Sequence, residues 1–219
     1  MRIATWNVER LKHFDQIDTM QSFCRDVAAD ILVLTETDGR IRPDYKYCVE
    51  TPKAKDVIPG LYKDTENRVS IYTDYPIIRQ YDTYDPYTAI CAELETEKGS
   101  LLVYGTIMGI FGNREKSYKS DLEMQMKDTR RLSENGSICI IGDYNCSFSD
   151  NYYFTNYGRD LVAGTFYDIG ISILTGSQPE CIDHIAVSDI FVEGADVEVT
   201  EWNLDKSLSD HKGIVVDLK

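Results

Sequence analysis

Short apolar runs that end in polar residues recur along this chain, and the spacing of the apolar positions differs from run to run. Residues 2–8 alternate between apolar and polar side chains, which predicts a first strand. Residues 15–29 place apolar side chains at helical spacing, and residues 30–36 form an almost continuous apolar run. A strand, a helix and a second apolar strand in this order predict neighbouring strands that are covered by helices.

The middle of the chain predicts three more strands, at residues 45–50, 68–73 and 87–95. Pro, Gly and Asp residues separate them, and we expect antiparallel pairing there. The loop at residues 51–67 is mixed in charge, so we expect it to be the most mobile segment. The remaining predicted elements are strands at residues 101–110, 137–141, 182–187, 191–199 and 213–218, and helices at residues 118–132 and about 159–170.

The strand at residues 137–141 is the most informative, because a Gly and two polar side chains follow it. Gly142 permits a sharp turn, and Asp143 and Asn145 are two residues apart, so in an extended chain they project from the same side. A carboxylate and an amide placed in this way can take a proton from a water molecule and hold that water. An Asx-type turn, in which both side chains bond their own backbone, explains this segment equally well.

Length and composition indicate one soluble domain. The chain has 219 residues, of which 42% are hydrophobic and 27% are charged. That is enough for a single well-filled core, and we expect one domain spanning residues 1–219. No apolar run approaches the ~20 residues of a membrane helix, and no leader sequence precedes the first strand. We therefore expect a cytoplasmic protein without a membrane segment.

Charge and cysteine content narrow the function classes. The formal net charge of −14 argues against a broad basic face that grips nucleic acid, although a local basic patch or bound divalent cations could still recruit a phosphate. The six cysteines are scattered without a C-x-x-C pair, so we expect reduced thiols and no zinc site.

Five short motifs place polar residues at predicted strand ends, from the first strand to the last. They are Thr5-Trp6-Asn7, Thr35-Glu36, Gly142-Asp143-Tyr144-Asn145, Ile182-Asp183-His184-Ile185 and Ser209-Asp210-His211. In this order, and over almost the full chain, they resemble the endonuclease/exonuclease/phosphatase superfamily. The resemblance implies a four-layer α/β sandwich, with two packed mixed β-sheets flanked by helices, and a metal-dependent phosphoester hydrolase.

The same resemblance implies a role for each matched residue. Glu36 is the expected principal ligand of Mg²⁺ or Mn²⁺, with Asn7 and Asp210 near the same ion or a second one. Carboxylate and amide oxygens are hard ligands that suit these ions. Asp143 is expected to activate or orient the attacking water with help from Asn145. His211, oriented by Asp183, is expected to contact a phosphoryl oxygen and stabilise charge in the transition state.

One feature of the superfamily has no counterpart here. Many members carry another histidine on the strand that here spans residues 103–108, but the chain has only His13, His184 and His211. Apurinic endonucleases use a tyrosine in that region, so we expect Tyr104 or Thr106 to supply a phosphate contact. We interpret His184 as a structural residue and His13 as a solvated residue at a helix start.

These observations favour a nuclease-like phosphodiesterase, with nucleic acid as the substrate. The alternative is a phosphatase that acts on a small phosphorylated metabolite, which the acidic charge slightly favours. Arg10, Arg114 and above all Arg159 leave room for a nucleic-acid strand, and the aromatic loop at residues 148–157 could stack on bases, although aromatic residues more often pack a loop onto the body. A third hypothesis, a binding module without catalysis, is disfavoured because all the core ligands are present.

Overall fold

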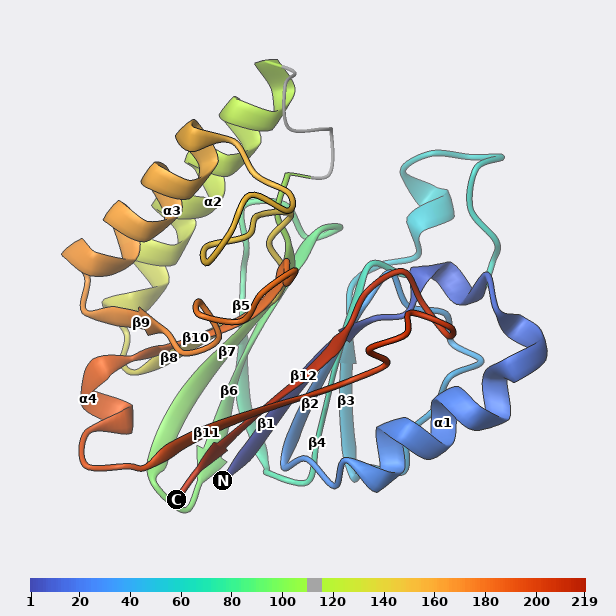
Figure 1. Cartoon of the computed structure of the whole chain (residues 1–219), viewed down its shortest axis with the longest axis horizontal. Coiled ribbons are helices and arrows are strands. Elements are labelled where there is room, and N and C mark those ends of the chain that lie inside the picture. Colours follow the sequence, from blue (N-terminus) through green and yellow to red (C-terminus); the bar gives the residue numbers. More distant parts are fainter. Residues whose placement is uncertain (110–115) are drawn as a thin grey trace.

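Two six-stranded β-sheets pack face to face in the computed structural model, which describes residues 1–109 and 116–219 (Figure 1). We call the sheet that contains β1 the first sheet and the sheet that contains β8 the second sheet. In spatial order, the first sheet consists of β11 (Val197–Trp202), β12 (Gly213–Leu218), β1 (Arg2–Asn7), β2 (Ile31–Thr35), β4 (Val69–Thr73) and β3 (Tyr47–Glu50). The second consists of β5 (Ile77–Tyr81), β6 (Ala89–Thr96), β7 (Gly99–Ile107), β8 (Ile138–Asp143), β10 (Asp183–Ser188) and β9 (Ile171–Ile173).

Both sheets are mixed. The β1–β2 pair of the first sheet and the β7–β8 pair of the second sheet are parallel, and the other paired strands are antiparallel. Each parallel pair is joined by a helical crossover, through α1 (Ile17–Asp26) in one case and α2 (Lys116–Ser133) in the other. The predicted antiparallel middle of the chain and the helix-covered first two strands are therefore confirmed.

Helices form the two outer layers. Helix α1 covers the outer face of the first sheet, where Met20 and Cys24 pack against Trp6 and Leu34. Helices α2 and α3 (Asn156–Asp168) cover the outer face of the second sheet (Figure 1). The predicted four-layer α/β sandwich is thus confirmed. The short helical segments are η1 (Glu9–Leu11), η2 (Phe14–Gln16), η3 (Ala54–Asp56) and α4 (Asp189–Val192).

The main core fills the space between the two sheets. Alternate residues of the central strands point into it, among them Val33 of β2, Ile71 of β4, Val103 of β7 and Ile141 of β8. The residues between them face the helices, which explains why these strands are apolar throughout. Burial on both faces fixes the strand register, and the register in turn fixes where each strand ends.

The largest difference from the sequence prediction is at residues 191–199, where we expected one strand. The chain instead forms α4, turns at Gly194 with a φ of +76°, and enters β11 only at Val197. A strand prediction based on apolar content failed here because Phe191 is buried from a helix. The short strands β5 and β9 were also not predicted; β5 is an exposed edge strand that lacks a buried apolar run.

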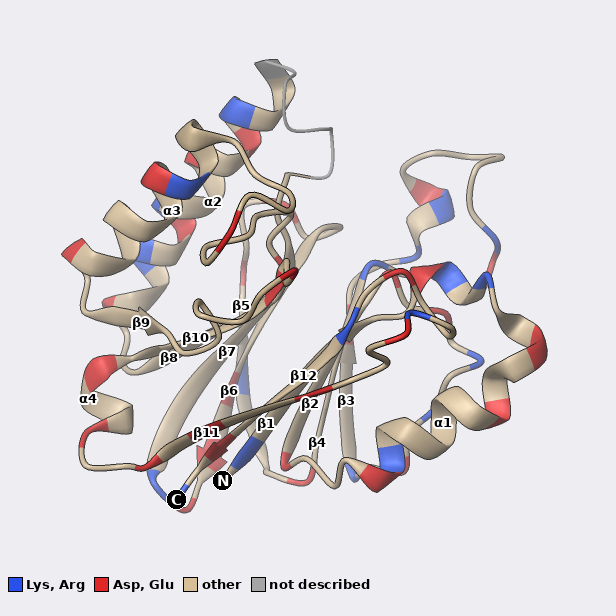
Figure 2. Cartoon of the chain, in the orientation of Figure 1, with Lys and Arg blue, Asp and Glu red and all other residues tan. Residues whose placement is uncertain are grey.

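The positions of the acidic residues and the lengths of the apolar segments are those of a globular chain. Acidic residues are spread over the helices and loops on both sides of the molecule (Figure 2), in keeping with the net charge of −14. Among the described residues, no helix is both long enough and apolar enough to cross a membrane.

Candidate active site

Strands β1, β2 and β8 end, and β10 and β12 begin, at the upper end of the sandwich in Figure 1. Three ionisable side chains from this region lie close together. Asp143, Asp183 and His211 each offer a polar atom, and these atoms all lie within 4.8 Å of one another. Asp143 and Asp183 face each other in the register of β8 and β10, and both are buried. His211 comes from the loop before β12, so the cluster joins the second sheet to the first.

The end of β8 is built around Gly142. Its φ is +134°, and a Cβ atom there would lie 2.2 Å from the carbonyl oxygen of Thr106, so only glycine fits. Asp143 Oδ1 then accepts the backbone N–H of Asn145 (2.8 Å), whose own φ is +48°. The Asx-type turn therefore exists, and it aims the second carboxylate oxygen, Oδ2, at the amide of Asn7 (3.2 Å). The Asn145 amide donates to the carbonyl oxygen of Met108 (2.8 Å).

Asn7 ties the end of β1 to the loop that carries His211. Its Oδ1 accepts the backbone N–H of Glu9 (2.9 Å), and its carbonyl oxygen accepts the Ser209 hydroxyl (2.7 Å). Ser209 Oγ in turn accepts the backbone N–H of His211 (3.2 Å). Two segments about 200 residues apart are thus held together by buried hydrogen bonds, which restricts where His211 can lie.

His211 lies between two carboxylates. Its Nδ1 is 2.6 Å from Asp183 Oδ2, and its Nε2 is 3.6 Å from Oδ1 of Asp210, a side chain that is 64% exposed. Burial alone would lower the pKa of His211, but the charge and hydrogen bond of Asp183 outweigh it and raise that pKa to about 10. The imidazole is therefore positively charged at neutral pH. Burial raises the pKa of Asp143 to about 7, against the opposing effect of the His211 charge.

Glu36 follows β2 directly and is partly buried, with a φ of +45°. Burial raises its pKa, while the charges of His211 and Arg68 lower it, which shows that these groups lie near one another. Within the described part of the chain, the Glu36 carboxylate forms no ion pair shorter than 4 Å. A partly buried carboxylate of this kind is suited to a cation from solution.

The structure does not bring Tyr104 to the cluster. Tyr104 is fully buried beneath α2, with its hydroxyl directed at Asp128 (3.4 Å), and Thr106 is hydrogen-bonded to Gln125 (2.9 Å). Neither can reach a substrate at the strand ends, so our expectation of a phosphate contact from these residues is corrected. In the parallel register of β7 and β8, the residue beside Asp143 is Ile107, which belongs to the core between the sheets.

Arg159 belongs to α3 and contacts the loop that follows β8. Its guanidinium group donates to the carbonyl oxygens of Ser147 (2.9 Å) and Asp150 and lies over the Phe154 ring. These contacts hold the aromatic loop against α3, and the side chain is partly exposed, so a substrate contact from Arg159 stays a prediction. Arg114 lies outside the described residues.

The aromatic loop has both packed and exposed rings, and stacking on bases stays a prediction. Phe148 packs edge-on against Tyr144 and His184, whereas Tyr152 and Tyr153 are exposed. The ring nitrogens of His184 contact Thr175 Oγ1 (3.0 Å) and the Cys146 carbonyl oxygen (2.9 Å), as expected of a structural histidine. His13 lies partly exposed at the start of η2, in agreement with its interpretation.

Two residues near the cluster were not singled out in the sequence. Glu9 Oε2 accepts the backbone N–H of Asp210 (3.1 Å), and Arg68 lies near Glu36. Arg68 could have been found from strand pairing. Because β2 and β4 are antiparallel with Thr35 opposite Val69, the residue that precedes β4 must lie beside the residue that follows β2.

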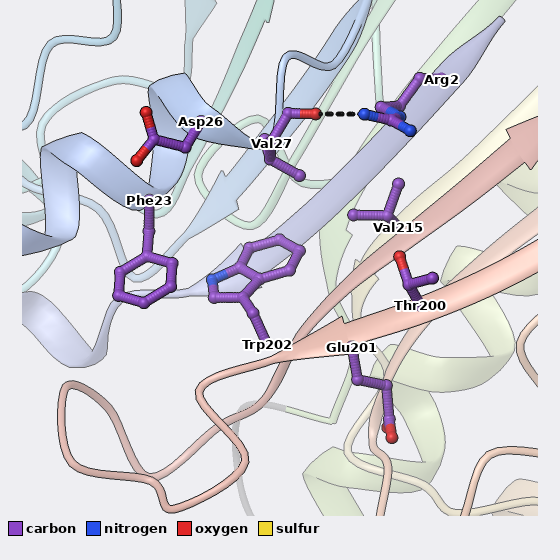
Figure 3. A pocket seen from close by; sticks show the side chains of 8 residues that line it. All are labelled: Arg2, Phe23, Asp26, Val27, Thr200, Glu201, Trp202 and Val215. Atoms are coloured by element: carbon purple, nitrogen blue, oxygen red, sulfur yellow. Dashed lines mark hydrogen bonds between the residues drawn. The ribbon is translucent and has the colours of Figure 1, made fainter.

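A separate pocket lies on the outer face of the first sheet, between α1 and β11 (Figure 3). It has a volume of about 260 Å³, and none of the candidate active-site residues lines it. Its walls include Phe23 of α1 and Trp202 of β11, whose indole ring covers Gly213 so closely that a Cβ atom there would lie 1.9 Å from it.

Comparisons with known proteins agree with this architecture. The model of the endonuclease/exonuclease/phosphatase family matches residues 4–211. Among solved structures, the 3′ phosphatase NExo from Neisseria, bound to a product DNA hairpin, is similar with a TM-score of 0.74 and 19% identity, covering 100% of this chain and 99% of the other. No match was found among curated proteins.

Two further structures share the fold. An AP endonuclease from Archaeoglobus fulgidus has a TM-score of 0.74 and 13% identity, with coverage of 100% of this chain and 99% of that chain. A humanized D. rerio TDP2 has a TM-score of 0.66 and 13% identity, with coverage of 100% and 98%. At these identities the likeness establishes the fold alone.

Proposed function

Because the chain belongs to the endonuclease/exonuclease/phosphatase family, we propose that it is a metal-dependent phosphoester hydrolase with nuclease-like phosphodiesterase activity. The observation that carries the proposal is the buried cluster of Asp143, Asp183 and His211, with Asn7 against Asp143 and Glu36 close by. The DNA hairpin product of the Neisseria 3′ phosphatase and the AP endonuclease activity of the Archaeoglobus protein support a nucleic-acid substrate.

The donor set fits a hard divalent cation. The available groups are carboxylate and amide oxygens, and Asp183 Oδ1 is buried without a hydrogen-bond partner. We assign Glu36, Asn7 and Asp210 as the residues that would hold Mg²⁺ or Mn²⁺. When bound, such an ion supplies positive charge to a phosphoryl oxygen and lowers the pKa of bound water.

The remaining residues account for proton transfer and for stabilisation of charge in the transition state. A pKa of about 7 allows Asp143 to accept a proton from the attacking water near neutral pH, while the turn that includes Asn145 fixes its direction. The charged imidazole of His211 can donate its Nε2–H to a phosphoryl oxygen, where negative charge develops as the P–O bond to the leaving group breaks. Asp183 orients that ring through Nδ1.

A phosphatase acting on a small phosphorylated metabolite is the second candidate. The net charge of −14 favours it, since a small substrate meets less repulsion than a polyanion. A catalytically inactive binding module is the least supported, because the groups proposed for proton transfer and charge stabilisation, Asp143, Asp183 and His211, meet in one place.

A substrate screen tests the proposal. We expect Mg²⁺- or Mn²⁺-dependent cleavage of bis-p-nitrophenyl phosphate and of DNA or RNA, which EDTA abolishes. Cleavage of p-nitrophenyl phosphate, a phosphomonoester, tests the phosphatase alternative. If the parent protein cleaves none of these in the presence of either metal, the hydrolase proposal fails and the binding module is favoured.

Glu36→Gln tests the metal assignment, because it replaces an anionic ligand with a neutral one of similar size. We expect turnover to fall by a factor on the order of 10² or more, and calorimetric titration to show weaker Mg²⁺ binding, with the circular dichroism spectrum unchanged. Glu193→Gln, at an exposed carboxylate after α4, is the matched control. Unchanged metal affinity in Glu36→Gln would transfer the ligand role to another carboxylate.

A further inference from the structure

Two arginine side chains stack on one tyrosine ring beside the proposed metal site. The guanidinium carbon of Arg10 lies 4.4 Å from the centre of the Tyr62 ring, and that of Arg68 lies 4.7 Å from it. Arg10 belongs to η1 after β1, Arg68 directly precedes β4, and Tyr62 belongs to the loop between β3 and β4. The arrangement thus joins three segments around the ends of β1 and β4.

The two guanidinium groups differ in how their charge is balanced. Arg10 pairs with the buried carboxylate of Glu66 (3.0 Å) and donates to the Leu61 carbonyl oxygen (2.8 Å). Arg68 donates to the Tyr62 hydroxyl, and no carboxylate of the described residues lies within 4 Å of it. Burial lowers the pKa of Arg68, which shows that its charge is only partly compensated by the protein.

Arg68 is partly buried and donates a hydrogen bond to one neutral hydroxyl, so it is suited to bind an anion. The guanidinium group carries five N–H donors in a planar fork that suits phosphate. The ring and the hydroxyl of Tyr62 hold the Arg68 guanidinium group, so less conformational freedom is lost when a ligand binds. After burial and Tyr62, the carboxylate that most affects the pKa of Arg68 is Glu36, the expected ligand of a divalent cation.

The strand order favours an anion other than the scissile phosphate. His211, Asn7, Glu36 and Arg68 flank β12, β1, β2 and β4, which are consecutive strands of the first sheet. At about 4.8 Å per strand, Arg68 is roughly one strand from Glu36 and about 14 Å from His211. This spacing of the backbones fits a second phosphate on the same substrate better than one phosphate shared by Arg68 and His211.

The loop that carries Tyr62 also exposes apolar surface. Val57, Ile58 and Leu61 are 49%, 41% and 54% exposed, and the Leu61 carbonyl oxygen contacts Arg10. Apolar surface beside a phosphate contact suits the bases of a nucleic-acid strand better than the polar body of a small sugar phosphate.

We propose that Arg68, oriented by Tyr62, binds a phosphate that flanks the scissile phosphodiester, and that the substrate is therefore a nucleic-acid strand. This inference rests on the proposed phosphodiesterase activity, and it names the substrate class of that same site.

Arg68→Gln, Arg68→Lys and a control variant test the subsite. Gln keeps a hydrogen-bonding group but removes the charge, whereas Lys retains the charge without the fork. Arg79→Gln is the matched control, because Arg79 also lies over a tyrosine ring, that of Tyr81 at 4.1 Å, but is exposed on the edge strand β5. The substrates are a single-stranded oligonucleotide and bis-p-nitrophenyl phosphate, which carries one phosphate.

In Arg68→Gln we expect the ratio of kcat/KM for the oligonucleotide to kcat/KM for bis-p-nitrophenyl phosphate to fall about 10- to 100-fold, as for loss of one charged hydrogen-bond partner. The slope of log affinity against log salt for the oligonucleotide should become shallower by about 0.7, the value for one phosphate on a single strand. Arg68→Lys should recover part of the ratio and the full slope. Arg79→Gln should match the parent in both.

Short substrates distinguish the possible sources of the second phosphate. In the parent, pTpT should be cleaved faster than TpT, and Arg68→Gln should remove the difference. A sugar bisphosphate hydrolysed in preference to pTpT would overturn the assignment to a nucleic-acid strand. An equal loss on one-phosphate and two-phosphate substrates, or no loss on either, would overturn the subsite itself.

The experiments distinguish a failure of the proposed Arg68 subsite from a failure of the proposed hydrolase function. If the parent cleaves no phosphodiester, the hydrolase proposal fails. The affinity for a labelled oligonucleotide, measured by fluorescence anisotropy, then tests the Arg68 subsite on its own. Equal affinity of the parent and Arg68→Gln would overturn it. The unfolding temperature of each variant identifies any misfolded protein, and Arg68→Lys then serves in place of Arg68→Gln.

Discussion

His211 and Asp183 each supply the charge that makes burial of the other tolerable. Asp183 is 1% exposed, and one of its carboxylate oxygens has no hydrogen-bond partner. The 2.6 Å contact with the imidazole Nδ1 compensates its charge, and in return the carboxylate keeps the ring protonated and oriented. Removing one partner leaves an uncompensated buried charge, which typically costs about 3–5 kcal/mol. Tests of this pair must therefore separate catalysis from stability.

At this scale we predict that His211→Ala lowers kcat by a factor on the order of 10² to 10³, with a smaller change in KM, because a preorganised donor to the transition state is lost. Asp183→Asn should act in the same direction, since the ring loses its fixed tautomer. The double variant should lose less than the sum of the two effects, because both changes disable one unit. Rates should be expressed per folded molecule, with the folded fraction taken from thermal unfolding. Parent-level rates in both single variants would refute the assigned role.

Strand β10 shows how one element serves both the site and the core. Successive residues of a strand point to opposite faces. Asp183 therefore faces the cluster with Asp143, while the next residue, His184, lies among Tyr144 and Phe148 on the helix side. Burial lowers the pKa of His184 to about 4, so the ring is neutral in the folded protein at neutral pH.

This burial predicts a pH dependence of stability. Between pH 4 and 6.5 the unfolded state binds more protons at His184 than the folded state. The contribution of the buried, neutral His184 ring to folding stability is therefore complete above pH 6.5 and is lost as the pH falls toward 4. The loss is up to about 1.4 kcal/mol per pH unit. The difference in unfolding free energy between the parent and His184→Gln, measured by urea denaturation, should shrink across this window. A difference that stays constant from pH 7 to 4 would contradict a neutral, buried ring. His13→Gln, which removes a partly exposed histidine, is the control.

The elements also show what the sequence could and could not predict. Strand ends were predictable where an apolar run meets a polar residue, as at Asn7, Glu36 and Asp143. The face of β7 that each side chain occupies was not predictable, because both faces of that strand are covered and residues 101–104 are all apolar. Tyr104 therefore looked available for substrate although it points into the helix layer. Arg68 became evident only from the pairing of β2 with β4, which is a long-range contact.

The packing of the two sheets determines the geometry of the site, because the proposed residues belong to different sheets. Asn7, Glu36 and His211 flank strands of the first sheet, whereas Asp143 and Asp183 belong to the second. The distance between the sheets therefore controls how the two groups meet. The sheets approach each other closely at Gly105 of β7, where a Cβ atom would lie 2.8 Å from Val69 Cγ1. Interiors at native packing density transmit such a clash to the backbone.

Gly105→Ala should therefore push the sheets apart by a few tenths of an ångström and affect both stability and catalysis. We expect a loss of about 1–3 kcal/mol in unfolding free energy, the usual cost of overpacking a core. A fall in kcat on the order of tenfold should accompany it, since small misplacements of reacting groups are costly. Gly164→Ala is the matched control, because a Cβ atom on this exposed position of α3 meets nothing within 4 Å. That variant should gain about 0.5–1 kcal/mol from helix propensity and keep its kcat. If Gly105→Ala loses stability but retains the parent kcat per folded molecule, the spacing of the sheets does not determine the geometry of the site.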